Sequence, residues 1–123
     1  NIEKFYEIEL LAREELNYPP YSWLAKVEFV GPSRSRLSSL IEKFKKNLKG
    51  IYTGLDILGP APCFLEKLKN NYRFQLVFKS KKSFDPNGIF LHKFINYNFK
   101  NFNNKKLLGR NKINIYFDPM SLL

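Results

Sequence analysis

The sequence has few of the residues that carry catalytic or cross-linking chemistry. It contains one cysteine, one histidine, one methionine and one tryptophan in 123 residues. The single cysteine, Cys63, excludes an internal disulfide framework and favours a reducing compartment. A zinc site needs about four ligands, and His92 and Cys63 alone do not supply them. The sequence predicts a small packing role for Cys63 and a surface or boundary position for His92.

Other functional signatures are also missing. Gly54 and Gly59 are not followed by the Gly-Lys-Ser/Thr of a phosphate-binding loop. The apolar runs are too short to cross a bilayer, and no signal-peptide pattern occurs. The carboxylates gather in the first helical stretch on a face predicted to be solvated, which does not suit paired acid–base catalysis. We therefore expect no catalytic residues, metal site or cofactor in this chain, no membrane contact, and a cytoplasmic location.

Acidic residues are scarce in all but the first quarter of the chain. The 21 basic and 11 acidic side chains give a net charge of +10. Residues 1–32 contribute −3 (three basic, six acidic), residues 33–60 contribute +4 (six, two) and residues 61–123 contribute +9 (twelve, three). This asymmetry predicts an acidic partner, with nucleic acid first. An alternative stays open, because an AT-rich genome enriches lysine and asparagine without selection for binding.

The length predicts one domain with a core that needs no covalent staples. Residues 1–17 are predicted to form an entry helix, because apolar residues recur at helical spacing over 3–16 and Pro19-Pro20 follow. Residues 18–123 are predicted to form the compact α+β domain. Since the chain begins within the helical pattern, we interpret it as a piece of a longer protein.

The remaining pattern alternates between strand and helix periods. Residues 22–30 alternate as a half-buried strand, and Ser33 is placed to cap a second helix that ends near Gly50. Pro60 and Pro62 are expected to interrupt a short strand over 55–58. Two further strands, 63–69 and 72–80, are expected to meet at an Asn70-Asn71 turn. A third helix is predicted to bury Phe90, Leu91, Phe94, Ile95 and Phe102, and 112–117 is the last strand.

This order predicts an α+β fold in which helices pack on a mostly antiparallel sheet. In the strand over 72–80, Tyr72, Phe74, Leu76 and Phe78 are expected to face the core. Arg73, Gln75, Val77 and Lys79 then face the other way. The polar members of that set form a strip that suits an anionic partner, because the planar guanidinium of arginine matches phosphate and carboxylate. Arg73 is equally able to pair with a neighbouring strand.

Four segments resemble the C-terminal domain of the primosomal replication-restart helicase family (primosomal protein N′, PriA). They are FYEIELLAR at 5–13, YPPYSWLAKV at 18–27, LGPAP at 58–62 followed by YRFQ at 72–75, and INIYFDPMSLL at 113–123. The family patterns are F-Y-E-x-E-L-x-x-R, Y-P-P-[FY]-S-x-L-A, G-R-Y-R-x-Q and D-V-D-P-x-S-L. All four occur here in the family's order.

The resemblance implies a four-stranded sheet like that of a small-subunit ribosomal protein. It implies a parent protein that is an ATP-dependent 3′-5′ DNA helicase, recognises abandoned forks and starts primosome assembly. ATP, magnesium and zinc are then expected in the parent's other regions. The implied partners are forked or single-stranded DNA, the acidic, Phe-ending tail of single-stranded DNA-binding protein (SSB), the parent's helicase lobes and other primosome proteins.

The sequence departs from the family patterns, and one departure falls on the first arginine, which with the glutamine helps hold the SSB tail in the family. Asn70 and Asn71 stand where the family has glycine and its first arginine, and Tyr116 replaces the first aspartate of D-V-D-P. The tail-binding prediction therefore rests on Gln75 and Arg73, with Lys69 as the candidate replacement cation. The DNA-binding prediction assumes that the third and last strands lie near each other, and it comprises Arg73, Lys79, Lys81, Lys82, Lys105, Lys106, Arg110 and Lys112.

Two other hypotheses remain open at this stage. The chain could be a structural docking domain for the helicase lobes with little DNA affinity of its own. It could also be a ribosomal-type RNA-binding protein, which its basic charge permits.

Overall fold

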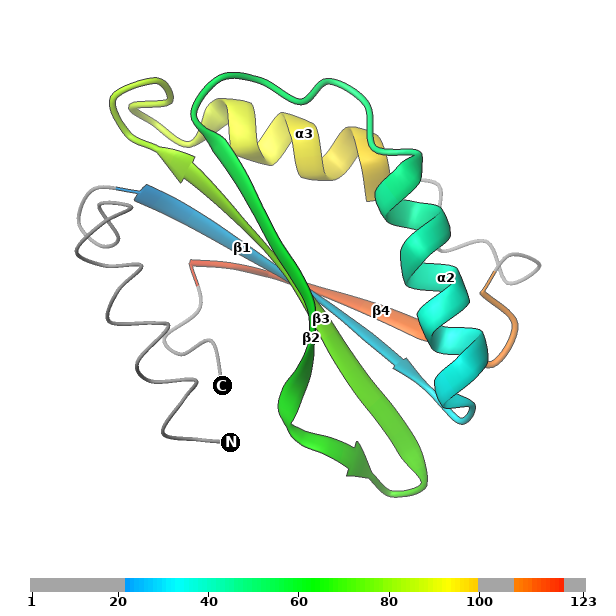
Figure 1. Cartoon of the computed structure of the whole chain (residues 1–123). Helices are drawn as coiled ribbons and strands as arrows, with labels where there is room; N and C mark the ends of the chain where they lie inside the picture. Colours follow the sequence, from blue (N-terminus) through cyan, green and yellow to red (C-terminus); the bar gives the residue numbers. More distant parts are fainter. Residues whose placement is uncertain (1–21, 100–107, 119–123) are drawn as a thin grey trace.

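Four strands form one antiparallel sheet in the order β2-β3-β1-β4. The computed structural model describes residues 22–99 and 108–118, with the backbone alone for 64–68. Its elements are β1 (Ser22–Gly31), α2 (Arg34–Lys46), β2 (Leu55–Leu68), β3 (Asn71–Lys81), α3 (Ile89–Phe99) and β4 (Lys112–Phe117). Both helices lie on one side of the sheet (Figure 1). The α+β prediction is confirmed, and the entry helix predicted over 1–17 lies outside the described residues.

The core forms between the helices and one face of the sheet. Alternate residues of β1 (Ala25, Val27, Phe29) and β3 (Phe74, Leu76, Phe78) are buried there, as the sequence predicts. Phe44 of α2 stacks on Phe99 of α3 with ring centroids 5.2 Å apart, which joins the two helices over the sheet. The face of β3 was therefore predicted correctly from its period of two.

Helix α2 begins as predicted and ends earlier. The Ser33 hydroxyl accepts a hydrogen bond from the Arg36 amide at 3.4 Å, so Ser33 is the N-cap. The helix stops at Lys46, because the Asn47 amide nitrogens donate to the carbonyls of Phe44 and Lys43 and close the last turn. The predicted end near Gly50 is therefore wrong. Gly50 lies in the following loop with a φ of +81°.

Helix α3 buries Leu91, Phe94 and Ile95, as expected, but not Phe90. The Phe90 side chain is 51% exposed, whereas Phe99 is buried. The helix begins at Ile89, and positions 91, 94, 95 and 99 then share one face at a period of 3.6 residues. Phe90 lies beside that face, so its predicted core position is wrong. Phe102 lies outside the described residues.

Strand β2 runs through both prolines, so the expected separate strands are wrong, but the expected interruption of the ladder at Pro60 is confirmed. It is a single strand from Leu55 to Leu68 that pairs with β3, with register shifts between Leu58 and Ala61 and between Pro62 and Lys67. Within the described sheet β2 is an edge strand, so a missing proline N–H removes no bond from a second neighbour. The pairing of β2 with β3 shifts in register at two places, and the strand itself continues from Leu55 to Leu68.

The β2–β3 hairpin turns one residue earlier than predicted. The two turn residues are Lys69 and Asn70, with φ values of 52° and 64°, and Asn71 already begins β3. A two-residue turn with positive φ at both positions matches the right-handed twist of its strands. Asn70 stands at the family's glycine position, where asparagine tolerates the left-handed conformation.

Gly59 is the glycine whose replacement is expected to disturb the sheet. Its φ is +104°, and a Cβ there would lie 2.7 Å from the Gln75 carbonyl oxygen. We expect Gly59→Ala to lower the free energy of unfolding by about 3 kcal/mol, combining left-handed strain with a backbone clash. Gly50→Ala is the control, because Gly50 also has a positive φ but open space around it. Urea denaturation should show a loss of only ~1 kcal/mol for the control; equal losses would contradict the clash.

Candidate nucleic-acid interface

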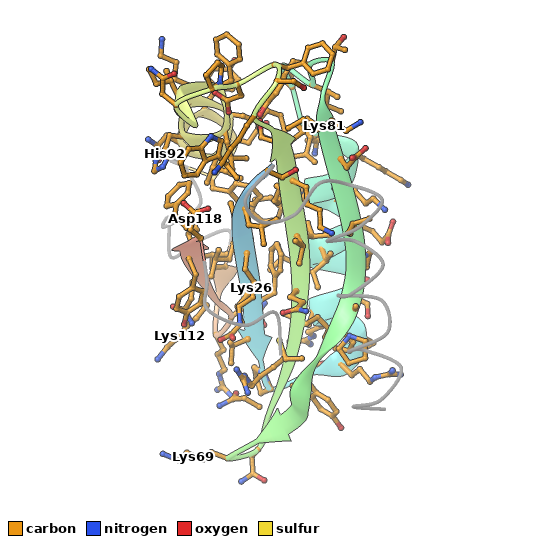
Figure 2. All side chains as sticks on the ribbon, turned by 90° about the vertical axis from the view of Figure 1, so that its left-hand side faces the viewer. Lys26, Lys69, Lys81, His92, Lys112 and Asp118 are labelled. Carbon is orange, nitrogen blue, oxygen red and sulfur yellow. The ribbon has the colours of Figure 1, made fainter. Side chains whose placement is uncertain are left out.

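The face of the sheet opposite the helices carries the predicted polar strip. Arg73, Gln75 and Lys79 of β3 point to this face together with Lys26 and Glu28 of β1, because Leu24 lies opposite Lys79, Glu28 opposite Gln75 and Val30 opposite Arg73. A small apolar cluster of Leu24 and Val77, with Leu58 packed against it, lies on the same face. Figure 2 looks toward this side, with Lys26 near the middle of the sheet.

The strip is largely occupied within the domain. An Arg73 guanidinium nitrogen lies 2.8 Å from a Glu28 carboxylate oxygen, and the Asn114 side-chain amide donates to the other Glu28 oxygen at 3.3 Å. The hydrogen bond between Arg73 and Glu28 raises the pKa of the Arg73 guanidinium. The alternative that Arg73 pairs with a neighbouring strand is thus confirmed. Gln75 and Lys79 are only 2% and 1% exposed, so neither side chain is available on the surface.

Cys63 lies beside the strip as a buried thiol. Its Sγ is 3.9 Å from the Gln75 side-chain oxygen. Burial, followed by the nearby Glu28 carboxylate, raises the pKa of the Cys63 thiol to about 11. A buried, protonated thiol suits the packing role that the sequence predicted, because the thiolate is the reactive form.

The raised pKa of Cys63 predicts slow alkylation and a loss of stability at high pH. At pH 8 iodoacetamide should react roughly 100-fold more slowly than with an unperturbed thiol, since about two pH units separate the pKa values. The folded state holds its proton more tightly, so this stabilisation is complete below pH 9 and is lost as the pH rises toward 11. Mass spectrometry measures the rate, with the urea-unfolded chain as control; equal rates in both states would contradict the burial.

The third and last strands lie near each other only in the sense that a single strand separates them. β1 lies between β3 and β4, and the antiparallel register places Lys79 opposite Leu24 but Lys112 opposite Val30. Six residues of extended chain separate those two positions, or about 20 Å. Lys81 and Lys112 accordingly lie toward opposite ends of the sheet (Figure 2). The predicted DNA-binding set is therefore divided, and Lys105 and Lys106 lie outside the described residues.

At one end, the predicted lysines are only partly accessible. Lys81 and Lys82 are half-buried, and the Lys82 ammonium lies 4.2 Å from the centre of the Trp23 ring. The Trp23 indole N–H in turn donates to the Asp85 carbonyl at 2.9 Å. These contacts hold the 81–88 loop against the start of β1. Trp23 thus anchors this loop to the sheet.

The other end of the sheet gathers exposed basic side chains from three separate segments. We call this set the basic end: Lys69 at the hairpin tip, Arg110 and Lys112 at the start of β4, and Arg34 and Arg36 at the start of α2, all exposed. Val30 pairs with both Arg73 and Lys112. A Cβ on Gly31 would meet the Asn111 side chain, so the segment before β4 lies against the end of β1. Among the side chains that the structure describes at this end of the sheet, Glu28 is the acidic one, and it pairs with Arg73.

Sequence reasoning placed Arg110 and Lys112 in the DNA-binding set and Lys69 in the SSB-tail set, and it did not single out Arg34 or Arg36. The available signal was that both arginines follow the strand 22–30 by a short Gly31-Pro32 turn, so they must lie at the end of that strand. The Arg34 guanidinium carbon lies 5.6 Å from the Phe74 ring centre, which places α2's first turn near β3.

Asp118 is a further family residue whose role becomes visible in the fold. Its carboxylate accepts from the Leu24 amide at 3.0 Å, and its own amide donates to the Leu24 carbonyl at 2.7 Å. These bonds fasten the end of β4 to β1. The Asp-Pro part of the family's terminal motif is therefore structural at Asp118.

The described residues contain no group of three or more His, Cys, Asp or Glu side chains placed to hold a metal ion. A search of the same residues found no helix long and apolar enough to cross a membrane.

Comparison with known proteins agrees with the sequence resemblance. The family model "Primosomal protein N C-terminal domain" matches residues 14–120. Among curated proteins, the chain is 37% identical over 82 residues to "Replication restart protein PriA" of Bacillus subtilis, covering 65% of this chain and 10% of that protein. It is 32% identical over 80 residues to the protein of the same name from Borreliella burgdorferi, covering 64% and 12%. The chain spans about a tenth of the length of these relatives, and it belongs to the primosomal protein N C-terminal domain family.

Proposed function

We propose that this chain is the DNA-binding C-terminal domain of a replication-restart helicase and that the basic end meets the phosphate backbone. The family and the names of the relatives support a role in replication restart. The observation that carries the proposal is that Lys69, Arg110 and Lys112, from segments far apart in sequence, lie exposed toward the same end of the sheet. A cluster of exposed cations with little opposing charge is the electrostatic footprint of a nucleic-acid surface.

The basic end has the properties of a surface that reads shape and charge. Its cations lie at a strand start, a hairpin tip and a helix start, where flexible side chains reach phosphates without entering a groove. Phosphate contacts position a protein on DNA but carry no sequence information. Binding should therefore tolerate any sequence and suit a forked or single-stranded substrate. Recognition of abandoned forks, ATP-dependent unwinding and primosome assembly by a cytoplasmic parent complete the proposal.

The direct test is a salt series with labelled forked, single-stranded and duplex DNA, measured by fluorescence anisotropy on this chain. Because each phosphate contact releases counterions, the logarithm of the binding constant should fall with the logarithm of salt at a slope near −0.9 per contact on duplex DNA, or about −3 to −5 for the basic end. Binding that is absent at low salt, or unaffected by salt, would contradict the proposal.

The SSB-tail site at Lys69, Arg73 and Gln75 stays a prediction. Lys69 is exposed, but Arg73 is paired with Glu28 and Gln75 is buried. A peptide that uses Gln75 would have to uncover it first.

A structural docking domain with little DNA affinity of its own is the second candidate. The burial of Gln75 and Lys79 and the internal Arg73–Glu28 pair support it, because they make the polar strip part of the domain's own structure and keep it from DNA. Under this hypothesis the chain holds the helicase lobes of its parent, and variants of the strip change stability without changing DNA affinity.

A further inference from the structure

The face of the sheet away from the helices is buried at its centre, although no described element lies over it. We call it the far face. Helices α2 and α3 both lie on the other side of the sheet (Figure 1). The central side chains of the far face are nonetheless at most 8% exposed: Ser22, Leu24, Lys26 and Glu28 of β1, Gln75, Val77 and Lys79 of β3, and Cys63 of β2. Side chains on a bare sheet contact their neighbours in the sheet, and water reaches them from above. A further layer of the chain must therefore cover the far face.

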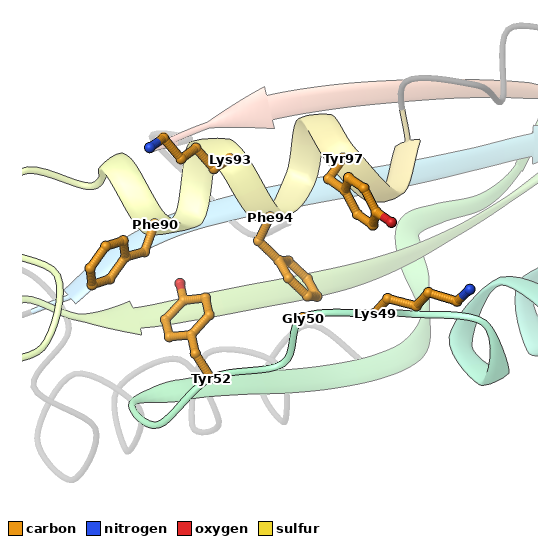
Figure 3. A pocket seen from close by; sticks show the side chains of 7 residues that line it. All are labelled: Lys49, Gly50, Tyr52, Phe90, Lys93, Phe94 and Tyr97. Carbon is orange, nitrogen blue, oxygen red and sulfur yellow. The ribbon is translucent and has the colours of Figure 1, made fainter.

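Uncovered side chains elsewhere in the domain are much more exposed. On the far face itself, Tyr116 of β4 lies beside the Lys26 ammonium and is 43% exposed. On the helix side, a pocket of about 430 Å³, which we call the α3 pocket, opens between Tyr52 and helix α3 (Figure 3). Phe90 and Tyr97, which line it, are 51% and 68% exposed. Near-complete burial at the centre of the far face therefore needs a cover.

The buried stripe on the far face has the size of one α-helix. It follows the adjacent strands β1 and β3 from Ser22 to Glu28, which is six residues of extended chain or about 20 Å. It stops before β4, and at its other margin Asp56 and Leu58 of β2 are half-buried. A helix is about 10 Å wide and rises about 1.5 Å per residue. About 13 residues of helix therefore fill the stripe.

Residues 3–16 are the segment whose length and attachment fit this stripe. They lie outside the described residues, and the sequence predicts a helix over them. The link 17–21 leads directly into Ser22, at one end of the stripe. Residues 100–107 lead from α3, on the helix side, toward β4. Residues 119–123 give an extended chain about 17 Å long and one strand wide, which is too narrow.

One side of the helix predicted over residues 3–16 is apolar, like the centre of the far face. Leu24 and Val77 form a buried cluster there, with Leu58 packed against it. The apolar side of the predicted helix consists of Phe5, Ile8, Leu11, Ala12 and Leu16. Packing these two surfaces together removes both from water, which is how a sheet face and an amphipathic helix are stabilised.

The charges of the two partners are opposite. Residues 3–16 hold five glutamates, one lysine and one arginine, for a net charge of −3. The basic side chains that the structure describes on the far face are Lys26, Arg73, Lys79, Lys81 and Lys112. The acidic ones are Glu28, Asp56 and Asp118, which leaves +2. Glu28 pairs with Arg73, and Asp118 accepts from the Leu24 amide. Glutamates over the buried lysines would therefore offset the cost of burying their charge.

We propose that residues 3–16 pack as a helix over the far face, with their apolar side on Leu24 and Val77 and their glutamates toward Lys26 and Lys79. The domain then has three layers, with the sheet between α2 and α3 on one side and this segment on the other. A ligand reaches the polar strip only when the segment is displaced, so the segment controls access to the strip. The proposal goes beyond DNA binding and does not depend on the basic end.

The first test uses Cys63, on the far face, to report whether the cover is in place. In the full chain, Phe5→Ser/Ile8→Ser should speed alkylation of Cys63 by iodoacetamide about tenfold or more, because lost apolar contacts let the segment leave. Tyr6→Ser/Leu10→Ser is the matched control on the opposite side of the predicted helix, and its rate should stay within about twofold of the unsubstituted chain's. Unchanged NMR amide signals of α2 and α3 establish that the domain is folded.

A second measurement leaves the apolar contacts intact. In a chain with Cys63→Ser, a nitroxide on Tyr6→Cys should broaden the NMR amide signals of Leu24 and Lys26 and spare those of α2, because paramagnetic broadening falls steeply with distance. A nitroxide on Lys43→Cys, an exposed position of α2, is the control and should give the reverse pattern. Sharp signals for Leu24 and Lys26 in the first chain would contradict the cover.

Three further results would overturn the proposal. One is alkylation of Phe5→Ser/Ile8→Ser at the rate of the unsubstituted chain. Another is faster alkylation in Leu122→Ser/Leu123→Ser with no change in the first pair, which would assign the cover to the C-terminal segment. The third is a chain dimer in sedimentation whose dissociation on dilution exposes Cys63, which would assign the cover to a second copy.

Discussion

Replacing Asp85 with alanine is expected to lower the free energy of unfolding by about 3–4 kcal/mol. Asp85 is 2% exposed. Its carboxylate accepts from the Ser80 hydroxyl at 2.8 Å and from the amides of Phe90 and Leu91 at 3.0 and 3.1 Å. The last two amides belong to the first turn of α3, so the carboxylate acts as the helix's N-terminal cap. Losing a cap costs ~1 kcal/mol, and each buried donor left without an acceptor costs about 1–3 kcal/mol more.

The Asp85 substitution should also disturb its surroundings. Ser80 also bonds the Tyr52 hydroxyl, and Tyr52 lines the α3 pocket. Thermal unfolding followed by the fluorescence of Trp23, the sole tryptophan, should show a midpoint roughly 10–20 °C lower. Asn87→Ala, an exposed change in the same loop, is the control, and its midpoint should lie within a few degrees of that of the unsubstituted chain. A midpoint for Asp85→Ala as high as that of the control would contradict the capping role.

Replacing Arg73 with alanine is expected to cost about 2–4 kcal/mol of stability. The Glu28 side chain is 6% exposed and the Arg73 side chain 22%. Removing the arginine leaves a buried carboxylate that keeps its hydrogen bond from the Asn114 amide but loses its countercharge, and such an uncompensated charge is costly. The reverse change, Glu28→Gln, leaves a partly exposed guanidinium that water can reach, so it should cost less.

A double-mutant cycle separates the Arg73–Glu28 pair from its surroundings. In urea denaturation, Arg73→Ala/Glu28→Gln should be more stable than the sum of the single changes predicts, by at least ~1 kcal/mol. Arg36→Ala removes an exposed arginine and should change stability by less than ~0.5 kcal/mol. Additive single changes would show that the pair is not coupled. Any DNA measurement on Arg73→Ala has to be made where the variant is folded.

Periodicity in the sequence predicted most of the sheet and both described helices. It failed where tertiary contacts decide. Phe90 is apolar like a core residue, yet its side chain is exposed because α3 begins at Ile89 and places Phe90 beside the buried face. Pro60 and Pro62 look like strand breakers, but an edge position makes them tolerable. Local sequence does not reveal which strand lies at an edge, because that depends on pairing between distant segments.

The candidate site was predicted in part for the same reason. The basic residues themselves were identifiable from charge, but their grouping required the strand order. Since β1 separates β3 from β4, Lys79 and Lys81 belong to one end of the sheet and Lys112 to the other. The family motif pointed to Arg73 and Gln75, and the structure shows that the first pairs with Glu28 and the second is buried.

The central claim is that DNA meets the basic end, and one comparison tests it most directly. Lys69→Asn/Arg110→Gln/Lys112→Gln removes three charges there, with asparagine chosen for the left-handed turn position. Lys43→Gln/Lys81→Gln/Lys82→Gln removes three charges elsewhere. With labelled forked DNA at about 0.1 M salt, the first variant should lose at least tenfold in affinity, and its salt slope should become shallower by about 2–3. The second should retain most of both. Equal losses, or a larger loss in the second variant, would contradict the account.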